Sequence, residues 1–166
     1  MPRRHIKPGY PPVYRTKPLL AHLDDSYKSR GKLPDPTLCP ECGAVFHKGK
    51  WQWQSKPESA HSEKCPACHR LHDQMPAGYV KLDGDFLKQN RAEIINLVNN
   101  VEHREKGGHP LQRIMNIGDE DGAVMVTTTD IHLARSIGEA ISRAYQGQLK
   151  LDYNTEENLL RVSWRR

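Results

Sequence analysis

The segments Cys39-Pro40-Glu41-Cys42 and Cys65-Pro66-Ala67-Cys68 decide the fold of the first half of this chain. They contain its four cysteines, and 22 residues separate the two pairs. Each Cys-x-x-Cys pair can form a tight turn that directs two sulfurs at one point. Two such turns complete a tetrahedral four-thiolate site, which suits Zn²⁺ because this ion imposes no geometry of its own. The spacing is close to that of a structural zinc ribbon. The predicted ligands of one zinc ion are Cys39, Cys42, Cys65 and Cys68.

The same cysteines have alternative uses. Two disulfides would need an oxidising compartment. Residues 1–5 carry positive charge without a following apolar segment, so we expect no secretory signal, a cytoplasmic protein and reduced cysteines. Residues 65–69 match the Cys-x-x-Cys-His motif of haem attachment, which would leave Cys39 and Cys42 unexplained. Residues 39–46 look like a rubredoxin knuckle, so iron is an alternative metal.

Histidines lie close to both cysteine pairs and could each replace one cysteine as a ligand; they are His47, His61, His69 and His72. Because four cysteines at the right spacing already complete the site, we expect these histidines to lie outside the ligand set. A catalytic zinc needs an open coordination position, and four thiolates leave none. The site therefore favours a protein that is not an enzyme.

Positive charge is concentrated at the N-terminus. The net charge of the chain is +5, whereas residues 1–32 alone carry +6. This segment is also rich in proline and contains three tyrosines, so we expect an arm that is extended and disordered when free. Lysine and arginine neutralise phosphates, and tyrosine stacks on unpaired bases. The arm thus predicts nucleic-acid binding, although it could serve solubility alone. Its candidate contacts are Arg3, Arg4, Lys7, Arg15, Lys17, Lys28, Arg30 and Lys32.

A second group of candidate contacts lies between the cysteine pairs. Trp51 and Trp53 alternate with polar residues and would share one face of a strand. They form either the small core of the ribbon or its packing surface on the next domain, or else a stacking platform for bases beside Lys48 and Lys50.

The remainder of the chain predicts an α+β domain. Strands are expected at residues 79–82, 111–117 and 123–128, and two more flank the turn at 154–158. Helices are expected at residues 86–105 and from Thr129 or Asp130 to about 146. The order β-α-β-β-α-β-β fits a two-layer sandwich, a variant of the ferredoxin-like plan. The predicted divisions are the arm (1–37), the ribbon (38–75) and the α+β domain (76–166).

Several other functions find no support. The chain has no glycine-rich phosphate loop and no Gly-x-Ser-x-Gly or His-Glu-x-x-His motif. It also has no run of 18 apolar residues, so we expect no membrane span.

Six segments carry a resemblance to a known family: 38–43, 64–69, 76–78, 109–111, 127–135 and 144–147. They resemble a small bacterial zinc-ribbon family of poorly defined function, whose members are associated with loci induced by low oxygen or stress. The order of ribbon and α+β domain is also distantly similar to the N-terminal part of the export adaptor of the large ribosomal subunit, which has more Cys-x-x-Cys pairs. That similarity implies a partner made of ribosomal RNA and protein.

The leading hypothesis is a non-enzymatic zinc-ribbon factor that binds RNA, with the ribosome as its favoured partner, under stress or low oxygen. Ribosomal proteins could add contacts. The first alternative is a zinc-ribbon adaptor between proteins, and the second is a rubredoxin-like iron protein with a redox role.

Overall fold

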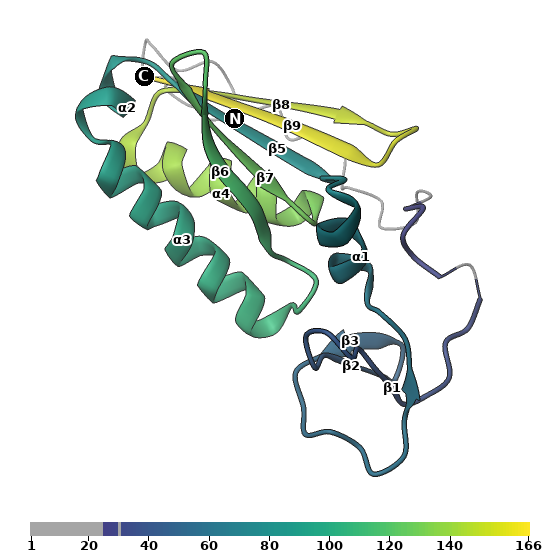
Figure 1. The fold of residues 1–166 in the computed structure, drawn as a ribbon. Coiled ribbons are helices and arrows are strands. Elements are labelled where there is room, and N and C mark those ends of the chain that lie inside the picture. The colour runs from purple at the N-terminus through teal and green to yellow at the C-terminus, as the bar shows by residue number, and fades with distance from the viewer. Residues whose placement is uncertain (1–24, 30) are drawn as a thin grey trace, which may run out of the picture.

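Two β-sheets and four helices make up the chain in the computed structural model, which describes residues 25–29 and 31–166 (Figure 1). The predicted mixed α+β class is confirmed. The first part contains β1 (Thr37–Leu38), β2 (Val45–His47), β3 (Lys50–Gln52), β4 (His61–Ser62) and α1 (Pro66–Asp73). The second part contains β5 (Gly78–Asp83), α2 (Asp85–Gln89), α3 (Arg91–Gly108), β6 (Ile114–Glu120), β7 (Ala123–Thr128), α4 (Ile131–Tyr145), β8 (Gln148–Asn154) and β9 (Leu159–Arg165).

The ribbon, defined here as β1–β4 with α1, is built around a small sheet. Its strand order is β3-β2-β1-β4, with β1 antiparallel to β2 and parallel to β4. Its buried cluster contains only three cysteines and two alanines, with Trp51 and Leu111 packed against it. So small an apolar core gives the ribbon little stability by itself.

The α+β domain has a five-stranded sheet of order β6-β7-β5-β9-β8. The central strand β5 is antiparallel to β7 and parallel to the last strand, β9. Helices α3 and α4 lie against one face of this sheet (Figure 1). Alternation along β9 places Leu160, Val162 and Trp164 in the core and the residues between them on the opposite face. The relation to the ferredoxin-like plan stays a prediction.

Helix α4 fits closely onto the sheet for local reasons. Asp130 caps it, because one carboxylate oxygen accepts hydrogen bonds from the backbone N–H groups of His132 and Leu133 at 2.8 and 3.1 Å. At Gly138 a Cβ atom would lie 2.5 Å from Cγ1 of Val162, so only glycine permits this approach to β9. The sequence prediction of this helix and its cap is confirmed.

Other elements differ in their bounds from the sequence predictions. The helix predicted over 86–105 is two helices, because Asn90 leaves the helical conformation (φ −122°, ψ 24°). The strand predicted from residue 111 begins at Ile114, because Leu111 and Arg113 contact the ribbon instead. Thr37, assigned to the arm, is buried in β1. The helix α1 was not predicted, because the second cysteine pair was interpreted as a turn alone.

No helix in the parts of the chain that the structure describes has the length and apolar character needed to cross a membrane.

Candidate functional site

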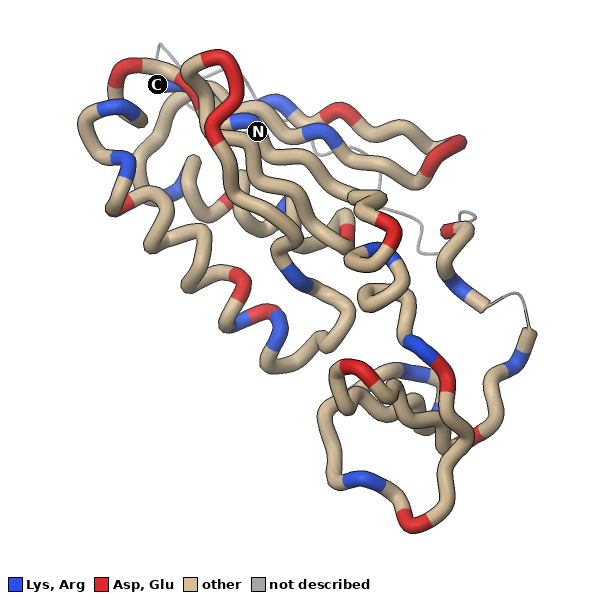
Figure 2. Tube along the Cα trace, in the orientation of Figure 1, with Lys and Arg blue, Asp and Glu red and all other residues tan. Residues whose placement is uncertain are grey.

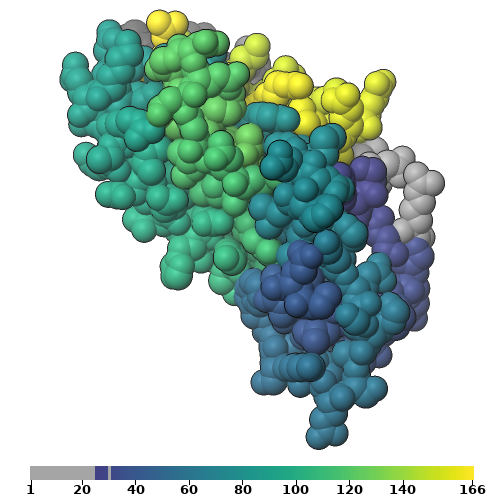
Figure 3. Space-filling model, in the orientation of Figure 1, coloured from purple at the N-terminus to yellow at the C-terminus, as the bar shows by residue number. Residues whose placement is uncertain are grey.

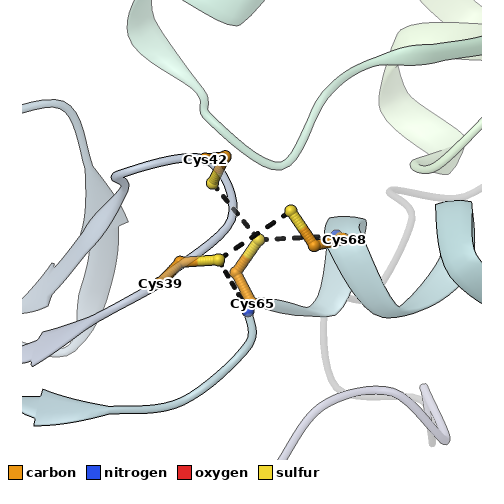
Figure 4. A group of neighbouring side chains, drawn as sticks. All are labelled: Cys39, Cys42, Cys65 and Cys68. Atoms are coloured by element: carbon orange, nitrogen blue, oxygen red, sulfur yellow. Dashed lines mark hydrogen bonds between the residues drawn. The ribbon is translucent and has the colours of Figure 1, made fainter.

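The four cysteines converge on one point between the ribbon sheet and α1 (Figure 4). Cys39 directly follows β1, and Cys42 lies in the turn before β2. Cys65 is the N-cap residue of α1, and Cys68 lies in the first turn of that helix. All four sulfur atoms lie within 4.8 Å of one another, and no disulfide joins them. The structure therefore brings together every residue predicted as a metal ligand.

Local hydrogen bonds fix the directions of these side chains. In the first pair, Cys39 N–H donates to Ala44 O at 2.8 Å and Gly43 N–H donates to Cys39 O at 3.0 Å. Gly43 has φ +79°, which closes this turn. In the second pair, Cys68 N–H donates to Cys65 Sγ at 3.5 Å, while Cys65 N–H donates across to Cys39 Sγ at 3.3 Å. Donors of this kind stabilise sulfur in its thiolate form.

The sulfur separations fit a tetrahedral metal site. A metal–sulfur bond of about 2.3 Å implies tetrahedral edges of about 3.8 Å. The Cys39–Cys68 and Cys42–Cys65 sulfurs are 3.8 and 3.7 Å apart. Three of the four cysteines are buried and Cys42 is half-buried, so the site is enclosed by protein. These four residues can hold one metal ion.

The thiols differ in acidity before any metal binds. The hydrogen bond between Cys42 and Cys65 is the largest influence on both: it lowers the pKa of Cys42 to about 4 and raises the pKa of Cys65. Burial raises the pKa of Cys68 to about 11. Metal binding needs thiolates, so it releases the protons that the cysteine thiols carry.

Arg113 is a buried contact of the site that the sequence analysis missed. Its guanidinium N–H groups donate to Cys68 Sγ at 3.4 Å, to Cys65 Sγ at 3.5 Å and to Pro110 O at 2.8 Å. Burial works to lower the pKa of Arg113, but the Cys68 hydrogen bond and the nearby sulfurs outweigh it and the pKa is raised. Arg113 therefore stays charged and offsets part of the negative charge of four thiolates. No sequence motif links Arg113 to the cysteines, because it lies 45 residues after Cys68.

The α+β domain closes the site through further contacts. Leu111 packs against the cysteine cluster. The indole N–H of Trp53 donates to Lys106 O, near the end of α3, at 2.7 Å. Thr129 accepts a hydrogen bond from Arg113 N–H at 3.0 Å, which fixes the loop that carries the guanidinium. The metal site thus lies at the junction of the two parts of the chain.

The arm end, defined here as the described residues among 25–33, is anchored on α1. Asp25 accepts a hydrogen bond from the buried Arg70 at 2.7 Å. The Arg70 guanidinium also lies over the Tyr27 ring, 4.4 Å from its centroid. Tyr27 O–H donates to Asp73 at 3.1 Å, and burial followed by this bond raises the pKa of Tyr27. Figure 3 shows this segment in purple beside the ribbon and α1.

A cleft of about 630 Å³ lies where the arm end, the ribbon and the α+β domain meet. The domain contributes the loop 109–112 and the first residues of α4. Four lysines face two carboxylates in its lining, and three histidines add donors and acceptors. One lysine, Lys64, is paired with Glu41 at 2.7 Å. The tube in Figure 2 shows the lysines of the arm end and of the ribbon along these two segments.

The predicted nucleic-acid contacts separate into three groups. Those outside the described residues are Arg3, Arg4, Lys7, Arg15, Lys17 and Arg30. Those that line the cleft are Lys28, Lys32, Lys50 and Trp51. Lys48 and Trp53 belong to the ribbon but not to the lining of the cleft. The RNA contacts of all these residues stay predictions.

The two tryptophans have different surroundings. Trp51 is half-buried, packs against the cysteine cluster and meets Phe46 edge to face with ring centroids 5.7 Å apart. Strand β3 ends at Gln52, so Trp53 lies beyond it, is 39% exposed and turns its indole N–H to α3. Trp51 therefore combines a packing contact with a place in the wall of the cleft.

Comparisons with protein-family models, with curated proteins and with solved structures find no match to this chain.

Proposed function

We propose that this chain is a zinc-ribbon factor that binds RNA and is not an enzyme. One observation carries the proposal: segments far apart in the sequence bring Lys28, Lys32 and Lys50 to one cleft beside Trp51. Lysines neutralise phosphates and an aromatic ring stacks on bases, so this combination is typical of single-stranded nucleic-acid sites.

Zinc is the metal that the donor set favours. Four cysteine sulfurs within 4.8 Å of one another, two pairs of them at 3.7 and 3.8 Å, and a nearby guanidinium suit a closed structural site. A closed site leaves no coordination position for substrate, which supports a structural role for the metal. Iron fits the same four sulfurs, so a red colour of the purified protein would favour the rubredoxin-like alternative.

The ribosome is the RNA partner that we favour, in the cytoplasm and under stress or low oxygen. This part of the proposal rests on the resemblance of the sequence to the stress-associated zinc-ribbon family and the ribosomal export adaptor. The protein-adaptor alternative has its own support in Leu71 and Met75, which expose apolar side chains at the end of α1.

The test is co-sedimentation of the protein with ribosomal particles from stressed cells at low and high salt. We expect binding that weakens with salt. The double variant Lys32→Ala/Lys50→Ala removes two phosphate contacts. The slope of log binding constant against log salt concentration should therefore become shallower by about 1.4. The matched control Lys88→Ala/Lys150→Ala removes the same charge from exposed positions outside the cleft. Salt-insensitive recovery with a protein partner would replace the RNA proposal with the adaptor.

A further inference from the structure

We infer that the cleft admits one unpaired nucleotide, with its phosphate at the lysines of the arm end and the ribbon, its base stacked on Trp51 and the edge of that base toward the α+β domain. This inference rests on the proposed RNA-binding function and names the form of RNA that the site takes. Four features of the cleft carry it: its size, the fixed aromatic ring, the origin of its charges and the anchoring of its outer wall.

The volume of the cleft suits a single nucleotide of an RNA strand. Its volume of about 630 Å³ lies within the range of about 300–1,000 Å³ for small-molecule sites. A duplex keeps its bases stacked inside, so only a nucleotide released from pairing can put its base into such a cleft. The cleft therefore selects single-stranded segments, loops or bulges over double helices.

The aromatic wall is held in place before any ligand arrives. Trp51 is fixed by the edge-to-face contact with Phe46 at 5.7 Å and by its packing against the cysteine cluster. Both rings line the cleft. A ring that is already immobilised loses little side-chain entropy on stacking, which favours a base as its partner.

The lysines of the lining all come from the arm end and the ribbon, together with Glu63, whereas the α+β domain contributes Asp130 and two histidines. Lys32 comes from the arm end and Lys50 from the ribbon, and both side chains are exposed. The carboxylate of Asp130 comes from the α+β domain and is held by its two backbone hydrogen bonds in α4. This carboxylate repels a phosphate, whereas its oxygen can accept a hydrogen bond from the amino group of a base. The phosphate thus belongs with the lysines and the base edge with the domain.

The outer wall is fixed by the contacts of the arm end. Asp25 and Tyr27 hold this segment on Arg70 of α1, four residues after Pro66, which begins that helix and lines the cleft. Lys28 directly follows this anchor, Lys32 lies five residues after Tyr27, and both line the cleft. This arrangement fixes the side from which a phosphate is contacted.

The experiment measures binding of the full chain, loaded with zinc, by fluorescence anisotropy to a labelled 12-nucleotide RNA and to the same strand annealed to its complement. We expect the single strand to bind about tenfold or more tightly. Trp51→Leu should weaken single-strand binding about fivefold or more, with unchanged zinc content as the sign of a folded ribbon. Lys32→Ala/Lys50→Ala should weaken it as well, whereas Lys88→Ala/Lys150→Ala should not.

A competition measurement keeps the test independent of the tryptophan variant. Adenosine 5′-monophosphate should displace the labelled strand at concentrations at which inorganic phosphate does not, because only the nucleotide offers a base. Equal affinity for the duplex, with the cleft variants unaffected, overturns the inference and leaves RNA binding in place. Failure of both RNAs to bind overturns the proposed function and this inference together.

Discussion

At the scale of single residues, Arg113 joins the metal site to the α+β domain. Arg113 is 8% exposed, and its guanidinium donates to the sulfurs of both Cys65 and Cys68. Groups that hydrogen-bond metal ligands tune the affinity of a site, and a positive charge also offsets the charge of four thiolates. The residue therefore serves the metal centre and the junction of the two parts.

Replacement of this residue should weaken metal retention. In Arg113→Leu we expect the affinity of the protein for zinc to be about 10–100-fold lower than in the unchanged protein. This affinity is measured by competition with a chromogenic chelator. The control is Arg91→Leu, which removes an exposed arginine whose partner is Asp119 at 3.0 Å, away from the cysteines. Equal zinc affinity of both variants would show that the guanidinium has no influence on the metal.

Asp35 offers a test of the pH dependence of the ribbon. The hydrogen bond with His47 at 2.6 Å, and then the bond from Lys48 N–H, lower the pKa of Asp35. A carboxyl whose pKa is lower in the folded protein adds stability above its unfolded pKa, and this contribution is lost as pH falls through the folded pKa. In His47→Ala the pKa of Asp35, measured by NMR from the titration of its carboxyl carbon, should rise toward the ordinary aspartate pKa of about 3.9. A midpoint that does not move would assign the shift to the backbone bond alone.

At the scale of elements, the arm end depends on α1. The Asp25–Arg70 pair is largely buried, with side-chain exposures of 14% and 7%. Removing one partner of a buried pair leaves the other charge uncompensated, which costs about 3–5 kcal/mol. In Asp25→Ala the arm end should detach, and trypsin should cleave after Lys28 and Lys32 at least about tenfold faster. Cleavage rates are read by mass spectrometry at short times.

A matched variant separates this effect from general destabilisation. Asp85→Ala removes an exposed carboxylate from α2, whose partner is Lys88 at 3.3 Å. Its cleavage pattern should match that of the unchanged chain. If Asp25→Ala also leaves trypsin cleavage of the arm end unchanged, the anchor on α1 does not hold this segment.

Elements of the α+β domain could be predicted where local signals agree. The apolar spacing of α4, its Asp130 cap and the alternation in β9 need no distant partner. The four cysteines of the candidate metal site could be predicted too, because two Cys-x-x-Cys turns are local motifs. Arg70 and Arg113 could not, because their roles come from Asp25 and Cys68, each 45 residues away. The late start of β6 has the same cause, since Leu111 and Arg113 are engaged by the ribbon.

At the scale of the whole molecule, the two parts have cores of different kinds. The main buried cluster of the α+β domain contains 18 residues between Ala77 and Trp164, and none comes from the ribbon. The ribbon cluster has five buried residues, three of which are cysteines. A metal held by these cysteines would supply folding free energy that so small a cluster lacks, whereas the larger core has its own apolar burial.

Metal removal should therefore unfold one part and spare the other. After zinc is chelated at neutral pH, we expect hydrogen exchange to rise throughout residues 37–73 and in the loop 109–113, while β5, β7 and α4 keep their protection. We expect the loop to lose protection together with the ribbon, because without zinc Arg113 no longer has metal-bound thiolates as hydrogen-bond acceptors. Returning zinc should restore protection in both segments. Exchange that rises equally in β7 and α4 would mean that the chain unfolds as one unit, and loop protection that persists without zinc would mean that Arg113 does not couple the domain to the metal.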